Sequence, residues 1–140
     1  INQNRYSIFD RTVENNGLKE TAAKLHKGII TFSPLAQGLL TNRYLDGIPA
    51  DSRVHTDGRF LKEKDITPEK IAKIRALNEI AAARGQTLAE MALAWLLSHE
   101  EITTVLIGAS KTQQILDNIK AVQNMKFTTE ELAEIDRISK

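Results

Sequence analysis

The sequence contains no cysteine, which excludes disulfide bridges, thiolate metal sites and cysteine nucleophiles. This absence is compatible with a reducing compartment, and we expect a cytoplasmic location. An excess of one charge sign is also missing, since 19 basic and 18 acidic residues leave a formal net charge of +1. Nucleic-acid binding requires a broader basic surface, and no apolar run approaches the roughly 20 residues of a membrane span. We therefore expect neither nucleic acid nor a membrane as a partner.

The remaining composition is that of a soluble globular protein, with 41% hydrophobic and 26% charged residues. A chain of 140 residues is long enough for one domain with its own core, so residues 1–140 are predicted to form a single domain. The chain starts at Ile1 rather than at a methionine, and strand-like residues follow without a lead-in. We expect it to be part of a longer protein.

Three segments have the β-branched and aromatic character of strands. Tyr6, Ile8 and Phe9 predict an opening strand that ends in the polar turn 14–17. Residues 29–32 predict a second strand that ends at Pro34, and residues 103–107 predict a third.

Apolar spacing and capping residues predict five helices. They run from Leu18 to His26, from Pro68 up to Gly85, from Leu88 to Ser98, and onward from caps at Ser110 and Thr128. The first helix should stop at Gly28, which would adopt a left-handed conformation. Ile115, Ile119 and Val122 should line the apolar face of the fourth helix.

The alternation of strands and helices is typical of parallel α/β architecture. Between the second strand and the next helix, residues 36–66 predict a long loop with one helical turn near Leu39, and loops of this length are usually functional. A complete (β/α)8 barrel needs about 250 residues. The fold class is therefore predicted to be α/β, formed by about the last three βα units of a (β/α)8 TIM barrel.

Two segments are candidate ligand sites from their chemistry alone. Ser110 and Lys111 precede a helix whose free amides favour an anion, although Ser110 could merely cap that helix. Phe32 ends a strand at the expected mouth of the barrel, where its ring could stack on a planar ligand or simply belong to the core. Gln3 offers both a donor and an acceptor to a ligand amide.

Other conspicuous residues are better explained by structure. Trp95 lies on the apolar stripe of its helix and is predicted to be a core residue. The three histidines, His26, His55 and His99, show no metal-ligand spacing. Charged residues between 51 and 59 are typical of a solvated face, although Arg43 and Arg53 could form bidentate bonds to a phosphate.

Three motifs together resemble the aldo-keto reductase superfamily in order and spacing. They are QNRY at 3–6, FSPLAQGLLTNRY at 32–44, and IGAS at 107–110 followed by DN at 117–118. The stretch GIPADSR at 47–53 is most similar to the bacterial branch of glyceraldehyde 3-phosphate reductases, which itself resembles the potassium-channel β-subunits. The resemblance covers the whole chain and implies its carboxy-terminal position in the family's barrel.

This resemblance implies an NADP cofactor, whose binding residues are carried over by matching positions. Gln3 would bind the nicotinamide carboxamide, and Phe32 would stack on the ring. The pyrophosphate turn would comprise Ser33, Pro34, Leu35, Gln37 and Gly38. Arg43 would bind phosphate, and Arg53 would lie near the cofactor. The 2′-phosphate would be held by Gly108, Ser110 and Gln114, with Asp117 and Asn118 beside adenine.

The family's catalytic tyrosine, lysine, aspartate and histidine lie on earlier strands, and no motif here matches them. We therefore expect no catalytic residue in this chain, and neither Tyr6 nor Tyr44 should be taken for the acid. The complete protein would contain this chain together with the missing amino-terminal half of the barrel, and it would reduce small aldehydes or ketones.

Two alternatives remain open. One is a cofactor-sensing interaction module like the channel β-subunits. The other is an inactive fragment whose exposed barrel edges pair with the complementary half or with a second copy, giving a homo-oligomer.

Overall fold

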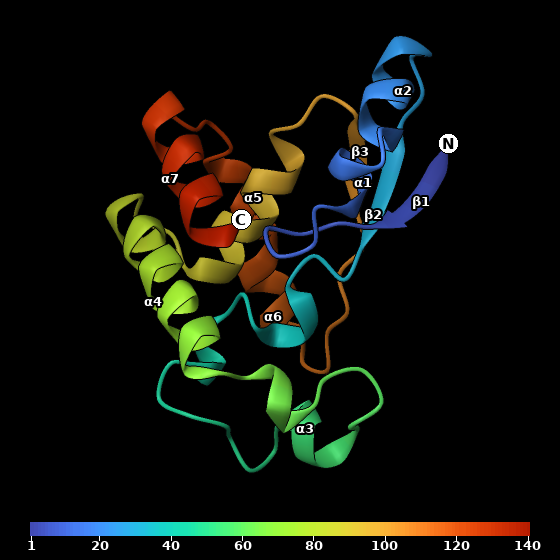
Figure 1. Cartoon of the computed structure of the whole chain (residues 1–140). Helices are drawn as coiled ribbons and strands as arrows, with labels where there is room; N and C mark the ends of the chain where they lie inside the picture. The colour runs from blue at the N-terminus through green and yellow to red at the C-terminus, as the bar shows by residue number, and fades with distance from the viewer.

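The computed structural model describes the backbone of all 140 residues and every side chain except that of Arg53. Its centre is a parallel three-stranded sheet in the order β1-β2-β3, formed by β1 (Asn2–Arg5), β2 (Ile29–Phe32) and β3 (Ile102–Val105). Each strand is separated from the next by helical segments, as Figure 1 shows. Parallel strands joined by helices are the arrangement expected of a partial barrel.

Helical segments account for most of the remaining chain. The α-helices are α1 (Thr12–Asn15), α2 (Leu18–Lys24), α3 (Arg53–Thr56), α4 (Pro68–Ala83), α5 (Leu88–Leu97), α6 (Thr112–Asn118) and α7 (Thr129–Ser139). Short 3₁₀ turns are η1 (Ala36–Gly38), η2 (Asn42–Tyr44), η3 (Glu63–Asp65) and η4 (Ile119–Gln123). The loop 36–66 therefore contains four short helical turns rather than the one expected near Leu39.

Helix α5 is the central element of the core. Most of its side chains are buried, including the predicted core residue Trp95. It contacts β3 on one side and α4 on the other, and α7 packs in turn on α4 (Figure 1). Ile29 and Thr31 of β2 are fully buried, whereas Gln3 and Arg5 of β1 are exposed. The sheet thus has one covered face and one open face.

Local capping signals in the sequence are confirmed at three helix starts. The Thr67 hydroxyl accepts a hydrogen bond from the Lys70 amide at 3.1 Å, and Pro68 occupies the first turn of α4. Complete capping boxes are present at α5, where Thr87 pairs with Glu90, and at α7, where Thr128 pairs with Glu131. Each signal acts within four residues, which is why the sequence suffices to predict it.

The opening strand is shorter than its apolar pattern predicts. It ends at Arg5, because the backbones of Ser7 and Asp10 bond reciprocally and the Ser7 hydroxyl accepts the amides of Phe9 and Asp10. Residues 14 and 15, expected in the polar turn 14–17, belong to α1 instead. Tyr6 and Ile8 are buried as core residues outside any strand.

The turn that ends α2 also differs from expectation. His26, with φ 51°, adopts the left-handed conformation that was predicted for Gly28. Gly28 is required for another reason: a Cβ there would lie 2.0 Å from the Thr103 hydroxyl oxygen on β3. This glycine allows the start of β2 to approach the neighbouring strand.

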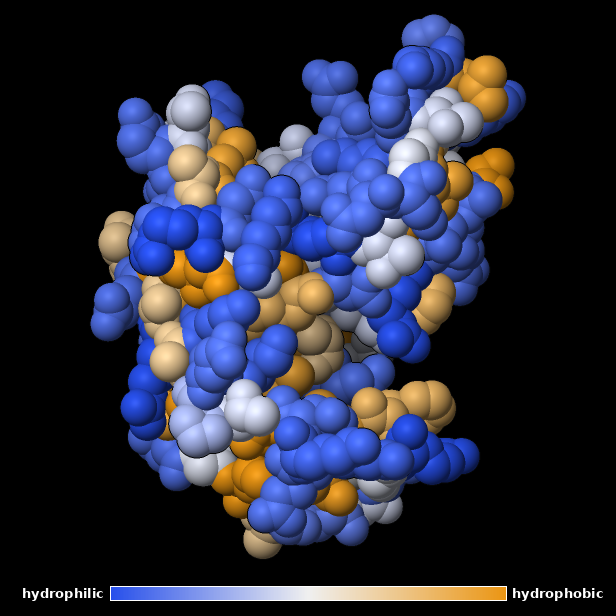
Figure 2. Space-filling view, in the orientation of Figure 1, coloured by the Kyte–Doolittle hydropathy of each residue, from blue (hydrophilic) through white to orange (hydrophobic). Residues whose placement is uncertain are grey.

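The apolar face predicted for residues 115–122 is present but uncovered. α6 ends at Asn118 and η4 follows, and the exposed fractions of Ile119 and Val122 are 54% and 58%. Hydrophobic side chains also reach the surface in patches on the face drawn in Figure 2, among more numerous hydrophilic ones. Among the residues described, no helix has the length and apolar content needed to cross a membrane.

Candidate functional site

The turn after β2 has a backbone conformation that the sequence did not predict. Three non-glycine residues, Ser33, Ala36 and Gln37, have φ values of 54°, 49° and 61°, and Gly38 follows at 93°. Left-handed backbone at non-glycine residues is uncommon and costs free energy, and it concentrates at ligand-binding and catalytic sites. The turn 33–38 is therefore the strongest structural indication of a site.

Backbone hydrogen bonds and apolar packing hold this turn in place. The amide of Ala36 donates to the Ser33 carbonyl at 3.1 Å, and the amide of Gly38 donates to Leu35 at 2.9 Å. The Leu35 side chain packs against a buried cluster that includes Leu93 of α5 and Ala121 of η4. The turn is thus anchored between α5 and the segment that follows α6.

Gly38 is needed for its conformation rather than for space. A Cβ at this position would meet only the Tyr44 ring, at 3.6 Å, which is ordinary van der Waals contact. Its φ of 93°, however, is one that side-chain-bearing residues rarely adopt. A larger residue at position 38 would therefore distort the turn even though the surrounding space is open.

The open face of the sheet brings together side chains from β1 and β2. Register pairs Gln3 with Ile30 and Arg5 with Phe32, and alternation places all four on one face. Gln3 and Arg5 are exposed, whereas Ile30 and Phe32 are half-buried. Phe32 is consequently neither a buried core residue nor free in solvent, and its ring borders the turn 33–38.

Arg43 already has acidic and carbonyl partners. Its guanidinium donates to the Asp51 carbonyl at 2.8 Å and forms an ion pair with the Asp51 carboxylate at 2.9 Å. The preceding Thr41 caps η2 by accepting the Arg43 amide. A phosphate would therefore compete with Asp51 for Arg43. The Arg53 side chain, also predicted to lie near a phosphate, is outside the described side chains.

The predicted cap at Ser110 is wrong in detail. The N-cap of α6 is Lys111, and the carboxamide oxygen of Gln114 accepts the amides of Ser110 and Lys111 at 2.8 and 3.2 Å. The Ser110 hydroxyl also donates to that oxygen at 3.3 Å. Gln114 thus organises the segment before α6, and its bonds to Ser110 join two of the residues predicted to hold the 2′-phosphate.

The two residues predicted beside adenine differ in accessibility. Asp117 accepts hydrogen bonds from Gln113 and Lys120, each at 2.9 Å, and the bond from Lys120 is the main cause of its lowered pKa. Asn118 is buried at the end of α6. Only Asp117 presents its polar group at the surface.

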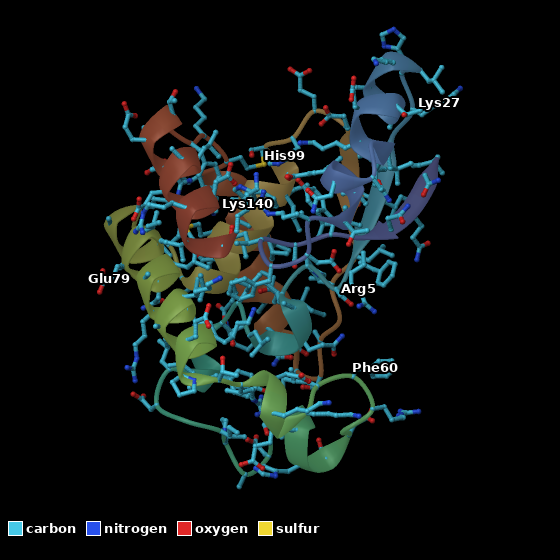
Figure 3. All side chains as sticks on the ribbon, in the orientation of Figure 1. Arg5, Lys27, Phe60, Glu79, His99 and Lys140 are labelled. Atoms are coloured by element: carbon cyan, nitrogen blue, oxygen red, sulfur yellow. The ribbon has the colours of Figure 1, made fainter. Side chains whose placement is uncertain are left out.

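Two of the predicted segments, the turn 33–38 and the residues leading to Ser110, follow the carboxyl ends of β2 and β3. The amide of Leu106 donates to the Thr31 carbonyl at 2.8 Å, so the segment leading to Gly108 and Ser110 leaves the sheet beside the turn 33–38. In Figure 3, Arg5 points away from the helices at this end of the sheet, above the loop that carries Phe60. The arrangement provides an open aromatic and polar face with basic groups in the adjoining loops.

A second polar cluster, on the helical side, was missed by sequence reasoning. Arg11 lies with its guanidinium carbon 4.2 Å from the Trp95 ring centroid and forms ion pairs with Glu14 and Asp136. Tyr6 donates its hydroxyl to Glu14, and burial is the main cause of its raised pKa. The Arg11–Asp136 contact joins positions 125 residues apart, which no local pattern reveals.

This helical-side cluster includes Tyr6, whereas the Tyr44 ring lies beside Gly38, 3.6 Å from the position that a Cβ there would take. Tyr6 and Tyr44 are fully buried, and Tyr6 packs edge-on against Trp95 with ring centroids 5.3 Å apart. A buried phenol with a raised pKa that is bonded to a carboxylate is poorly suited to donate a proton to a ligand at the mouth of the barrel.

Comparison with known proteins places the whole chain in one family. The family model described as "Aldo/keto reductase family" matches residues 1–140. L-glyceraldehyde 3-phosphate reductase of Escherichia coli O157:H7 is 48% identical over 140 residues, which cover 98% of this chain and 40% of the relative. A protein of Schizosaccharomyces pombe named as a voltage-gated potassium channel subunit beta is 41% identical over 115 residues, covering 79% of this chain and 33% of that protein.

Solved structures agree with the sequence relatives. The holo form of an aldo-keto reductase from Bacillus halodurans matches all of this chain and 43% of its own, with a TM-score of 0.73 and 26% identity. A thermostable aldo-keto reductase in complex with the inhibitor epalrestat matches 97% of this chain and 38% of its own, with a TM-score of 0.67 and 26% identity. The chain thus spans about two fifths of the length of these relatives.

Proposed function

Because this chain belongs to the aldo/keto reductase family, we propose that it supplies the NADP site of a complete reductase acting on small aldehydes or ketones. The observation that carries the proposal is the left-handed turn 33–38 at the carboxyl end of β2, beside the exposed face that carries Gln3 and Phe32. Carboxyl ends of parallel barrel strands are where such enzymes bind their ligands.

The residues present suit an extended dinucleotide. The half-buried Phe32 ring offers a flat surface for the nicotinamide, and the Gln3 carboxamide can both donate to and accept from the nicotinamide amide. The left-handed backbone at residues 36–38 could approach a pyrophosphate closely, and Arg43 and Lys111 would supply positive charge to phosphates. We also propose Ser33, Pro34, Leu35 and Arg53 around the pyrophosphate, Gly108, Ser110 and Gln114 at the 2′-phosphate, and Asp117 with Asn118 at adenine.

Catalysis in the complete protein requires groups outside this chain. Bound NADPH supplies the hydride that reduces the carbonyl. The chain's part is to hold the nicotinamide on Phe32 and fix its carboxamide with Gln3, so that the ring is presented to the open face. The proton for the new hydroxyl would come from elsewhere in the barrel, since Tyr6 and Tyr44 are fully buried and the Tyr6 hydroxyl is bonded to Glu14.

The uncovered surfaces support a role within a larger barrel. The outer edges of β1 and β3 have no strand partner in this sheet, and the apolar face of α6 and η4 is exposed. We propose that the amino-terminal part of the barrel covers these surfaces in a cytoplasmic protein of one barrel domain. Two copies of this chain could also pair through the same strand edges and form a homo-oligomer.

A cofactor-sensing module is the second candidate, favoured by the 41% identity to the channel subunit β of S. pombe. Assays of the full-length protein separate the two. The reductase proposal predicts consumption of NADPH with glyceraldehyde or butanal, whereas a pure sensor would bind NADPH without turnover. Residues 1–140 alone, shown to be folded by circular dichroism, should give no turnover. Reduction by that piece would refute the placement of the catalytic groups outside it.

A further inference from the structure

Arg5 is a cation on the open sheet face for which the cofactor site gives no role. It stands at the carboxyl end of β1, two residues after Gln3 and opposite Phe32 in register. Its guanidinium carbon lies 5.9 Å from the Phe32 ring centroid, near the outer limit of a cation–π contact. Arg5 therefore borders the ring that is proposed to hold the nicotinamide.

Among the described residues, Arg5 has no acidic partner. Other arginines here are engaged: Arg11 with Glu14 and Asp136, and Arg43 with Asp51. Arg5 is exposed, forms no ion pair in this part of the structure, and extends away from the helices in Figure 3. Its contact with the Phe32 ring neutralises no charge.

Closure of the barrel would change the surroundings of this cation. The open face of the sheet then becomes the interior, and its carboxyl end becomes the mouth where substrate approaches the nicotinamide. A guanidinium does not lose its proton at physiological pH, and an enclosed charge without an anionic partner is costly. An anionic group bound at the mouth would satisfy it.

We propose that Arg5 is a specificity-determining residue that favours carbonyl substrates bearing a phosphate or carboxylate. This inference rests on the proposed reductase function and adds a substrate class to it. The planar guanidinium can form two parallel hydrogen bonds to either anion, which a lysine ammonium cannot. Neutral aldehydes of the same size lack this contact and gain nothing from Arg5.

The test uses the full-length protein and two matched substrate pairs. Glyceraldehyde 3-phosphate is compared with glyceraldehyde, and succinic semialdehyde with butanal. In Arg5→Met, kcat/KM for the anionic member of each pair should fall about tenfold to hundredfold, as expected when one charge-assisted contact is lost. The neutral members should change less than about twofold, and Arg5→Lys should recover part of the loss.

Controls separate this inference from its alternatives. Arg137→Met removes another exposed arginine, on α7, and should leave the kcat/KM of both substrate classes unchanged. NADPH affinity in Arg5→Met should also be unchanged, and a loss there would assign the cation to a cofactor phosphate and overturn the inference. Equal losses of kcat/KM for charged and neutral aldehydes would overturn the inference, and so would a lower free energy of unfolding in Arg5→Met. Either result would indicate that Arg5 pairs with a carboxylate elsewhere in the barrel. If the wild-type protein reduces none of the four aldehydes, the proposed function itself fails.

Discussion

Replacing Arg11 by methionine tests whether the helical-side cluster joins the two ends of this chain. Arg11 lies beside α1, and its side chain is only 8% exposed. It donates to the Ile8 carbonyl at 3.0 Å, to Glu14 at 3.0 Å, and to Asp136 and Ser139 of α7 at 2.9 and 3.1 Å. Methionine preserves much of the packing on Trp95 while removing all of these bonds.

The expected loss of unfolding free energy depends on whether each hydrogen-bond acceptor of Arg11 finds another donor after the substitution. The Ile8 carbonyl loses a buried donor, which costs about 1 kcal/mol or more. Glu14 keeps its bond from Tyr6, whereas Asp136, with a side chain 45% exposed, regains water and contributes little. Including the lost contact with Trp95, the free energy of unfolding should fall by about 2 to 4 kcal/mol.

Urea denaturation of the full-length protein, followed by circular dichroism, measures this loss. Arg137→Met is the matched control, because Arg137 pairs with Glu134 on an exposed face, where an ion pair contributes little to stability. NADPH affinity of the folded Arg11→Met protein should be unchanged. Equal stability losses in the two variants would refute the role of Arg11 as the link between α1 and α7.

Two further predictions concern the turn 33–38 and His99, whose ring packs edge-on against Tyr6 and Trp95. Gly38→Val should weaken NADPH binding about tenfold or more in calorimetric titration, because φ 93° excludes a β-branched residue, and unchanged affinity in a folded variant would remove the turn from the site. The pKa of His99 is lowered to about 4, mainly by burial and then by Lys19, so its neutral form is favoured in the folded state. On acidification the imidazole of His99 takes up a proton in the unfolded chain at a higher pH than in the folded protein. The contribution of His99 to the free energy of unfolding should therefore be fully present above about pH 6.5 and fall by roughly 2 to 3 kcal/mol towards pH 4. His99→Phe should remove that part of the pH dependence, and an unaltered profile would contradict the assignment.

Local sequence signals predicted the helices and strands of this chain better than the contacts between them. The capping residues Thr67, Thr87 and Thr128 each act on an amide three residues away, and all three are confirmed. The end of β1 was misplaced, because apolar Tyr6 and Ile8 are buried beneath helices rather than within a strand. An apolar pattern reports burial and does not by itself identify the element that is buried.

In the candidate site, too, the sequence predicted the local elements better than the backbone conformation and side-chain contacts. Phe32 and Pro34 were singled out from the end of a strand, and the structure places them at the carboxyl end of β2. The left-handed conformations of Ala36 and Gln37 had no signal, because neither residue type favours them and the surrounding packing imposes them. Gln114 was placed in the site by resemblance alone. Its bonds to Ser110 and Lys111 depend on side-chain geometry that spacing does not determine.

The central claim, that this chain holds NADP and recognises its 2′-phosphate, is tested most directly by binding of both cofactors to the full-length protein. Gln114→Glu is the decisive variant, because a carboxylate can still accept the amides of Ser110 and Lys111 while repelling a phosphate. Arg43→Ala is the second variant, because we propose that Arg43 reaches the same 2′-phosphate from the loop. Dissociation constants for NADPH and NADH should be measured for both variants and for the wild-type protein. We predict that the wild-type protein prefers NADPH, and that each variant loses about tenfold or more in NADPH affinity with little change for NADH. Equal affinity of the wild-type protein for the two cofactors, or equal losses for both in the variants, would contradict the account.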